Sequence, residues 1–239
     1  TFIFDVWSCR KKKGLLGAIE RAQKFLRKYP KSFVWRSDVK KFFDNVNHVT
    51  LLKIISLKIS DKQAIWILKE IINSYFVPAA TQRERERVNA VSPKGIPIGN
   101  LTSQIFANIY LNELDRFVKH IIKPQAYLRY GDDFIVISDY LNELKQNKEK
   151  IQDFLKEKLC LVINLKNDII VKARQGLYFL GVEIFVKGRR LKRRNWTRAV
   201  RRLNSQNIAS YSGLVKKHSN NKRIKEFNWI VLDKLNSEL

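Results

Sequence analysis

The stretch YLRYGDDFIVIS, residues 127–138, constrains the fold of this chain more than any other. Two runs rich in aromatic and β-branched residues flank a glycine and two adjacent aspartates, which is the pattern of two strands joined by a tight turn. Asp132 and Asp133 would then share the tip of an antiparallel hairpin. Two carboxylates so close repel each other unless a cation neutralises them. Taken alone, an ordinary turn is the commoner explanation of such a pair.

A second acidic position precedes this hairpin. The stretch SFVWRSDV, residues 32–39, predicts a strand that ends at Asp38. If that strand lies beside the hairpin, Asp38 adds a third carboxylate, and such a set can hold two Mg²⁺ ions about 3.5–4 Å apart. Mg²⁺ prefers oxygen ligands of this kind. Alone, Asp38 fits a helix cap or a turn residue equally well.

A glycine-punctuated segment, GIPIGNLTSQ at residues 95–104, separates these two acidic blocks. Gly95 and Gly99 allow the backbone to bend and to approach a ligand closely. The hydroxyls of Thr102 and Ser103 suit contact with a ligand but are explained as well by capping of the helix that follows. A glycine loop that leads into a polar helix face suits contact with a nucleotide and its template base.

The remaining elements follow from periodicity and punctuation. Helices are predicted over residues 14–28, 48–59, from a capping box at 60–63 to about 75, 102–122 and 139–158. Strands are predicted over 159–165 and 176–186, the second with a hairpin through 187–188, and a solvated loop or hairpin over 77–99. After Gly188 the composition changes: residues 187–203 hold nine basic residues and no acid. Two or three short helices are expected from there to the end.

Charge limits the functional classes. The 239 residues carry a formal net charge of +25, which favours a polyanionic partner such as nucleic acid over a basic but uncommitted surface. No apolar run approaches the roughly 20 residues of a membrane span, so no membrane partner is expected. The two cysteines and three histidines form neither a disulfide framework nor a zinc pattern. With no export signal, unpaired thiols fit a reducing cytoplasm.

Taken in order, the blocks resemble motifs A to E of the reverse transcriptases of bacteria and phages. Motifs A, B and C correspond to residues 37–48, 95–115 and 127–138, and motifs D and E to 161–167 and 176–184. The resemblance implies an α+β right-hand polymerase palm, an antiparallel sheet with helices on one face. It further implies partial fingers over 1–37, a palm over 38–188 and a basic helical thumb over 189–239. The finger motifs that grip triphosphate in the family lie upstream of residue 1.

The same resemblance implies the catalytic groups. Asp38, Asp132 and Asp133 would be the catalytic carboxylates of a two-Mg²⁺ site, for which Mn²⁺ could substitute. Asp38 and Asp132 would be the main metal ligands, helped by the backbone carbonyl of Val39. Lys166 matches the motif D lysine that protonates the leaving pyrophosphate, although a solvated surface lysine is the alternative.

The resemblance also implies which residues contact the nucleotide and the template. A GDD turn is shared with RNA polymerases, so Gly131 does not decide between RNA and DNA products. Phe43 occupies the position of the steric gate that favours deoxynucleotides, and because adjacent residues point apart, its neighbour Phe42 is expected to pack in the core. The nucleotide and template contacts implied by the resemblance are Val39, Phe43, Ile98, Gly99, Asn100, Gln104 and Arg10.

The block IGNLTSQ, residues 98–104, is similar to the reverse transcriptases of diversity-generating retroelements. That subgroup copies a template RNA from a DNA or RNA primer, uses dNTPs, misincorporates opposite adenine during mutagenic retrohoming, and works with a small basic accessory oligomer. Apolar Ile98 would lower discrimination, because it cannot hydrogen-bond the incoming nucleotide as glutamine does. An antiphage-defence enzyme, a group II intron-like enzyme and a catalytically silent RNA-binding scaffold are the alternatives.

Overall fold

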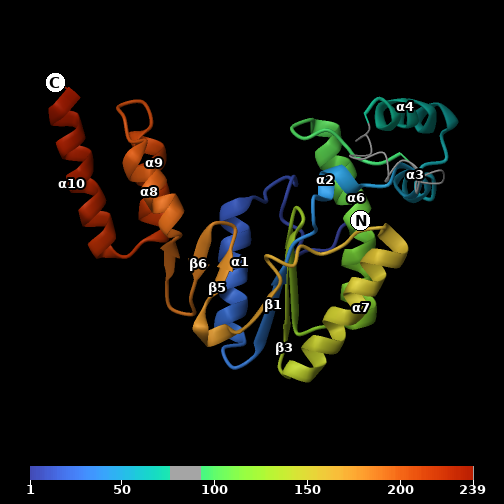
Figure 1. Cartoon of the computed structure of the whole chain (residues 1–239), viewed down its shortest axis with the longest axis horizontal. Helices are drawn as coiled ribbons and strands as arrows, with labels where there is room; N and C mark the ends of the chain where they lie inside the picture. The colour runs from blue at the N-terminus through green and yellow to red at the C-terminus, as the bar shows by residue number, and fades with distance from the viewer. Residues whose placement is uncertain (76–92, 239) are drawn as a thin grey trace, which may run out of the picture. The chain divides into compact units, whose positions relative to one another are not determined.

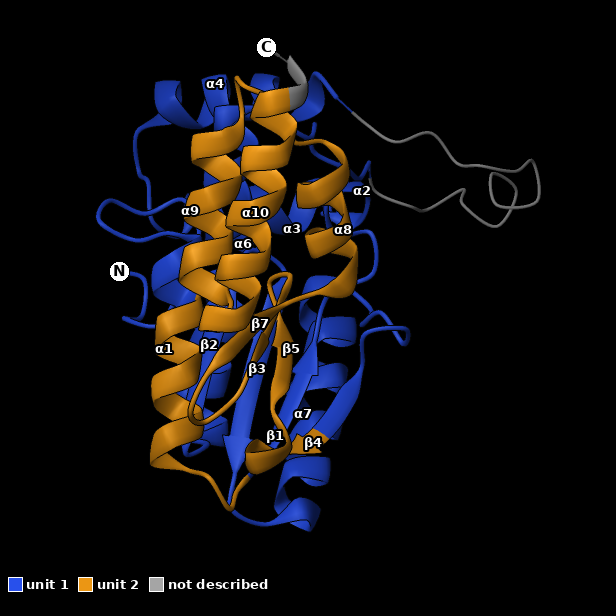
Figure 2. Cartoon of the chain, turned by 90° about the vertical axis from the view of Figure 1, so that its left-hand side faces the viewer, with its two compact units in different colours: residues 1–18, 33–170 blue, residues 19–32, 171–239 orange. Residues whose placement is uncertain are grey.

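A computed structural model describes residues 1–75 and 93–238 (Figure 1). The chain divides into two compact units, residues 1–18 with 33–170 and residues 19–32 with 171–239 (Figure 2). Both units combine helices with an antiparallel sheet, so the α+β class is confirmed. The predicted loop over 77–99 lies largely outside the described residues.

The first unit is built on a sheet with strand order β2-β3-β1-β4. The strands are β1 (Phe33–Ser37), β2 (Ala126–Tyr130), β3 (Asp133–Ser138) and β4 (Ile169–Lys172), of which β4 belongs to this unit only through its first two residues. The central strand β3 pairs antiparallel with both β1 and β2. Every residue of β3 after Asp133 is buried, which explains its unbroken run of large apolar side chains.

The first unit also contains five α-helices among its described residues. They are α2 (Phe42–Asn45), α3 (His48–Ser56), α4 (Lys62–Asn73), α6 (Leu101–Phe117) and α7 (Leu141–Leu159), and α6 continues as a π-helical turn, η1 (Val118–Ile122). Helix α7 packs on β1 and β3, and α6 packs on α7 and α3. The core between them includes Trp35, Phe134 and Leu155. Trp35 and Phe134 meet edge to face with ring centroids 5.2 Å apart.

The second unit contains residues 19–28 of helix α1 (Leu15–Lys28) and a three-stranded antiparallel sheet in the order β5-β6-β7. Its strands are β5 (Leu177–Phe179), β6 (Val182–Ile184) and β7 (Arg189–Leu191), followed by helices α8 (Arg193–Arg201), α9 (Ile208–His218) and α10 (Asn221–Glu238). Gln23 of α1 donates to the carbonyls of Phe185 and Gly188, at 2.9 and 3.0 Å, and so fixes the turn between β6 and β7.

Most predicted elements are present, with three differences in type or position. Residues 159–165 do not form a strand, and β4 begins only at Ile169. The predicted strand 176–186 is interrupted by a turn at Leu180 and Gly181, whose φ angles of 51° and 81° are left-handed. Asp61, not Ser60, caps α4 by accepting from the amides at 63 and 64.

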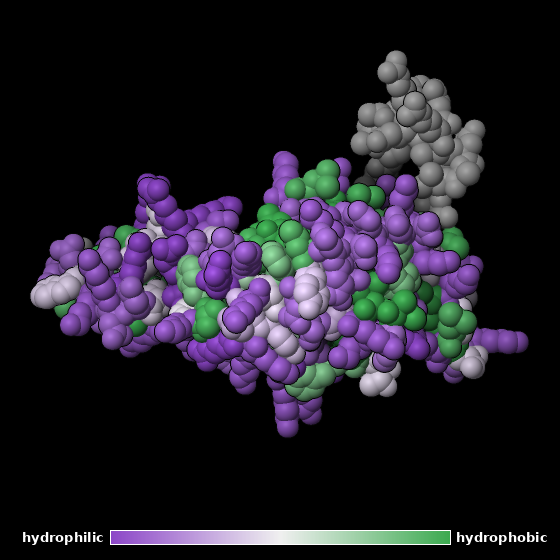
Figure 3. Space-filling model, turned by 90° about the horizontal axis from the view of Figure 1, so that it is seen from below, coloured by the Kyte–Doolittle hydropathy of each residue, from purple (hydrophilic) through white to green (hydrophobic). Residues whose placement is uncertain are grey.

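The expected division into fingers, palm and thumb stays a prediction. The compact units follow a different boundary, because residues 171–188 group with the C-terminal helices rather than with residues 38–170. Hydrophilic residues cover most of the face shown in Figure 3, with apolar side chains gathered in separate patches. No helix in the described part of the chain combines the length and the apolar character needed to cross a bilayer.

Candidate active site

The turn between β2 and β3 carries the two adjacent aspartates. Tyr130 pairs with Asp133, so Gly131 and Asp132 form the connection itself. Gly131 has φ of 63°, a left-handed conformation that glycine adopts without strain and most residues do not. Asp132 therefore lies at the tip of the hairpin, as expected.

Strand β1 brings the third aspartate to the same place. In the β1–β3 register Ser37 lies opposite Phe134, so the next residue, Asp38, leaves the strand beside Asp133. An antiparallel bridge between Val39 and Ile163 continues the pairing on the other side of Asp38. The condition for a three-carboxylate site, that the Asp38 strand adjoins the hairpin, is therefore met.

Burial and the charge of neighbouring carboxylates raise the pKa values of Asp132 and Asp133. The pKa of Asp132 is raised to about 6, chiefly by burial and in part by the nearby carboxylates of Asp133 and Asp38, while its own backbone amide acts in the opposite direction. Burial also raises the pKa of Asp133, although Arg36 opposes that shift. Arg36 Nη2 donates to Asp133 Oδ1 at 2.7 Å. A cluster of carboxylates that resists ionisation is one that a cation would stabilise.

The donor set fits a hard divalent cation by type. Asp38 Oδ1 is buried and has no hydrogen-bond partner, so this oxygen has an unused lone pair inside the protein. Among residues 1–75 and 93–238, no three His, Cys, Asp or Glu side chains already converge into a metal-binding group. Asp133 is instead paired with Arg36. The carboxylates of this region offer the oxygen ligands that such a cation prefers.

A buried polar network fixes the hairpin turn. Arg129 of β2 and Asp115 of α6 are completely buried and form a two-pronged ion pair, with Nε to Oδ1 at 2.7 Å and Nη2 to Oδ2 at 2.6 Å. Arg129 Nη1 donates to the carbonyl of Gly131 at 2.8 Å, and the Gly131 amide donates to Ser8 Oγ at 2.9 Å. Both backbone groups of the glycine are thus tied down, and the position of Asp132 follows from them.

The glycine loop is anchored next to the segment that follows Asp38. The amide of Ile96 donates to the carbonyl of Phe43 at 2.8 Å, and the Gly95 carbonyl lies 2.6 Å from His48 Nε2. Gly95 and Gly99 have φ angles of 104° and 93°, so the bends expected there are present.

A comparison with known families decides the identity of the chain. The family described as "Reverse transcriptase (RNA-dependent DNA polymerase)" matches residues 8–184. The chain belongs to the reverse transcriptase family. Its matched region contains all three aspartates and the glycine loop.

Individual relatives are distant. The group II intron-encoded protein LtrA of Lactococcus lactis is 23% identical over 212 residues, covering 63% of this chain and 34% of LtrA. Protein YkfC of Escherichia coli is 24% identical over 187 residues, covering 65% of this chain and 47% of YkfC. The chain therefore spans less than half the length of these curated relatives.

Solved structures support the fold. The apo telomerase of Candida tropicalis superimposes with a TM-score of 0.56 at 16% identity, covering 95% of this chain and 45% of the telomerase. The telomerase of the same organism in complex with a TWJ fragment of telomeric RNA gives 0.55 at 15% identity, covering 98% of this chain and 43% of that one. Identities this low show a shared fold alone, which is consistent with a polymerase palm.

Motif B of this reverse transcriptase exposes the predicted contact residues. Ile98 is 78% exposed, Gly99 has open space around it, and Asn100 begins α6 without a side-chain cap bond. Gln104 Oε1 accepts from Cys9 Sγ at 3.1 Å. The alternative that the hydroxyl of Thr102 or Ser103 caps helix α6 is wrong. Asn100 occupies the cap position, and Ser103 Oγ is buried without a partner.

Two aromatic residues of motif A divide as expected. Phe42 is buried in the core, with its ring centroid 6.4 Å from that of Tyr110. Phe43 is only partly buried. Its side chain is thus the one with a surface left to meet a ligand.

The roles predicted for Lys166 and Arg10 stay predictions. Lys166 is exposed, and its backbone amide donates to Asn164 Oδ1 at 3.2 Å. Arg10 Nη1 donates to the carbonyls of Ile3 and Val6, at 2.6 and 3.0 Å, so its guanidinium is engaged by the N-terminal segment.

Sequence reasoning missed the residues that contact Asp38. Asn164 and Asn167 donate to Asp38 Oδ2 at 3.3 and 3.0 Å. The signal was present in two asparagines close in sequence, but the predicted strand 159–165 contained Asn164 and ended before Asn167, so nothing indicated that both meet one partner.

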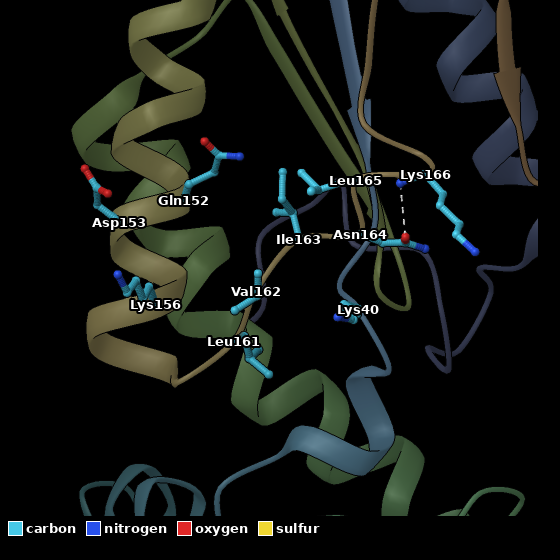
Figure 4. A pocket seen from close by; sticks show the side chains of 10 residues that line it. All are labelled: Lys40, Gln152, Asp153, Lys156, Leu161, Val162, Ile163, Asn164, Leu165 and Lys166. Atoms are coloured by element: carbon cyan, nitrogen blue, oxygen red, sulfur yellow. Dashed lines mark hydrogen bonds between the residues drawn. The ribbon is translucent and has the colours of Figure 1, made fainter.

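The same motif D segment forms one wall of a pocket of about 350 Å³ (Figure 4). Helix α7 supplies Gln152, Asp153 and Lys156, and Lys40 and residues 161–166 complete the lining. Figure 4 shows Asn164 beside Lys166 with the backbone-to-side-chain bond between them.

Proposed function

We propose that this chain is an RNA-directed DNA polymerase that makes cDNA with two divalent ions, Mg²⁺ or in its place Mn²⁺. The observation that carries the proposal is the placement of Asp38 beside the hairpin tip, with the Oδ1 atom of Asp38 buried and unpaired. Membership of the reverse transcriptase family over residues 8–184 supports it. The family also supports the division into fingers (1–37), palm (38–188) and thumb (189–239).

Each carboxylate has a distinct part in this proposal. Two bound Mg²⁺ ions would activate the primer 3′-hydroxyl and stabilise the leaving pyrophosphate. Asp38 and Asp132 hold them, with the backbone carbonyl of Val39. Asp133, already neutralised in part by Arg36 at 2.7 Å, keeps the charge balance of the turn. Lys166 serves as general acid for the pyrophosphate.

Other side chains select and bind the substrates. Phe43, partly buried beside the glycine loop, acts as the gate against a ribose 2′-hydroxyl. Ile98, Gly99, Asn100 and Gln104 contact the incoming dNTP and its template base. Arg10 reaches the triphosphate or template after releasing the N-terminal carbonyls.

The basic helix α8 supplies affinity for the template–primer duplex. Five arginines and a threonine line a surface hollow of about 450 Å³, namely Arg193, Arg194, Thr197, Arg198, Arg201 and Arg202. Arginines so placed favour contact with phosphates, which gives affinity without sequence reading and a strong dependence on salt.

Primer extension on a defined RNA template tests the proposal. Asp132→Asn should abolish incorporation of dNTPs while the circular dichroism spectrum and binding of the template–primer stay as in the wild type. Asp153→Asn, which removes an exposed carboxylate from α7, is the matched control and should retain activity. Activity retained by Asp132→Asn would refute the metal assignment. A wild-type chain that binds RNA but incorporates nothing would favour a silent scaffold.

The finer assignment is to the retroelement subgroup, with errors at template adenines and a small basic accessory oligomer. The exposed Ile98 in the block IGNLTSQ supports it. The similarity to a group II intron-encoded protein favours a second candidate, an intron-type enzyme. Sequencing of the cDNA made on a defined RNA separates them. Errors concentrated at adenines support the first, accurate copying supports the second, and a product without a template points to antiphage defence.

A further inference from the structure

The segment that follows helix α7 makes three hydrogen bonds to Asp38. The side-chain amides of Asn167 and Asn164 donate to Asp38 Oδ2 at 3.0 and 3.3 Å. The backbone amide of Asn164 donates to the Asp38 carbonyl at 2.8 Å. Both the main chain and the side chain of Asp38 are therefore held by one short segment.

Hydrogen bonds and an ion pair hold residues 164–168 in place. Asn167 N donates to the Asn164 carbonyl at 3.0 Å and closes a turn. The next residue, Asp168, accepts from Trp35 Nε1 at 2.6 Å and pairs with Lys148 of α7. Trp35 is fully buried in β1, the strand that Asp38 directly follows. The two asparagines are thus fixed to the same strand that carries their acceptor.

The two amides bond the same oxygen. Oδ2 accepts both, whereas Oδ1 is buried and has no partner. A carboxylate held in this way cannot rotate to exchange its two oxygens without losing both bonds. Asparagine is suited to the task because its amide is a neutral donor, so it orients the carboxylate without bringing in a positive charge that would compete with a cation.

We propose that Asn164 and Asn167 are positioning residues that hold Asp38 by Oδ2 and present Oδ1 to a divalent ion. The inference rests on the proposed function, in which Asp38 is a metal ligand. It gives motif D of this chain a role at the metal site that does not depend on Lys166. Partners of this kind orient metal ligands, and their loss typically weakens metal binding about 10–100-fold.

The test uses the full chain with a template–primer and four substitutions. Asn167→Ala and Asn164→Ala each remove one amide. Asn167→Leu removes the donor but keeps the volume, so it separates hydrogen bonding from packing. Leu165→Ala is the matched control, because Leu165 lies in the same turn and is 78% exposed.

Two quantities are measured, the dissociation constant for Mn²⁺ by electron paramagnetic resonance and the Mg²⁺ concentration that gives half-maximal primer extension. For Asn167→Ala and Asn167→Leu alike, both should rise about tenfold or more, with a smaller rise for Asn164→Ala because its bond is longer. Leu165→Ala should match the wild type in both. Affinity for the template–primer should stay the same in all four variants.

The outcomes distinguish failure of the positioning role from failure of the proposed polymerase function. Wild-type metal affinity in the Asn167 variants would overturn the positioning role alone. Recovery of metal affinity in Asn167→Leu would also overturn it, since packing would then be the cause. A wild-type chain that neither binds Mn²⁺ nor extends a primer would refute the proposed function, and the inference with it. If Asn167→Ala fails to fold, Asn164→Ala and Asn167→Leu carry the same test.

Discussion

The buried pair between Asp115 and Arg129 should be the most sensitive point of the first unit. The substitution Asp115→Asn keeps the shape of the side chain but removes its charge. Both side chains have an exposed fraction of 0%. The guanidinium of Arg129 would lose its charged partner without gaining access to water.

The cost can be worked out from the contacts. Burial lowers the pKa of Arg129, but the adjacent Asp115 carboxylate outweighs it and raises that pKa, so the arginine stays charged. Breaking one partner of a buried ion pair costs about 3–5 kcal/mol, because the other charge is left uncompensated. For a chain of this size, each kcal/mol lowers the melting temperature by about 2–4 °C. The expected fall is therefore about 6–20 °C.

The loss should reach the active site as well. Arg129 also donates to the Gly131 carbonyl at 2.8 Å, so an arginine that moves towards water releases the turn that positions Asp132. Primer extension at a temperature where the variant is still folded should fall with it. Thermal unfolding followed by circular dichroism measures the first effect, and Asp153→Asn serves as the control.

A double substitution makes the reasoning refutable. Asp115→Leu with Arg129→Met removes both charges, and replacing a buried ion pair by apolar groups is often neutral or stabilising. The double variant should therefore melt above the Asp115→Asn single variant. If the single variant loses less than about 1 kcal/mol, which is the range of exposed ion pairs, the pair does not behave as a buried one.

Three further predictions concern the site. Because the pKa of Asp132 is raised from 3.8 to about 6, the folded state binds the extra proton, and metal-free stability should fall by up to about 3 kcal/mol as pH rises from about 4 to 6. Denaturant titrations check this, and a fall of the same size in Asp132→Asn would contradict the assignment. Phe43→Ala should raise ribonucleotide incorporation in primer extension; unchanged selectivity would refute the gate. Ile98→Gln should reduce errors opposite adenine in sequenced cDNA, and an unchanged spectrum would exclude Ile98 as their cause.

The relation of Asp38 to the hairpin could be predicted from two local signals together with the order of the motifs. A strand that ends at an aspartate and a second strand pair joined at Gly131 have clear patterns, and adjacency of the strands then places the carboxylates together. The motif order, taken with a known family, supplied that adjacency. The strand ends, the turn at Gly131 and the strand order place these carboxylates without reference to side-chain packing.

The supports of the site could not be predicted in the same way. Arg129 occurs in an apolar strand, which indicates that it needs a partner, but several acids lie close in sequence and only packing of α6 on the sheet selects Asp115. Asn164 was placed in the predicted strand 159–165 and Asn167 beyond its end, so the prediction gave no reason for both side chains to meet one partner. The turn closed by their backbone bond at 3.0 Å brings both to Asp38 instead.

Gly131 allows a last test of how the turn works. Its φ of 63° is left-handed, and a side chain there costs about 1–2 kcal/mol of backbone strain. A Cβ built on Gly131 meets no atom within 4 Å, so Gly131→Ala creates no clash inside the protein. The variant should therefore lose about 1–2 kcal/mol in a denaturant titration and still fold.

Activity of the same variant then separates two roles of the glycine. If Gly131 serves only the backbone conformation, the KM for primer should stay the same in Gly131→Ala. If the open space beside it is filled by the primer end, the added methyl should raise the KM for primer at an unchanged KM for dNTP. A rise in both would contradict the two roles together, because the left-handed turn would then have shifted Asp132 itself.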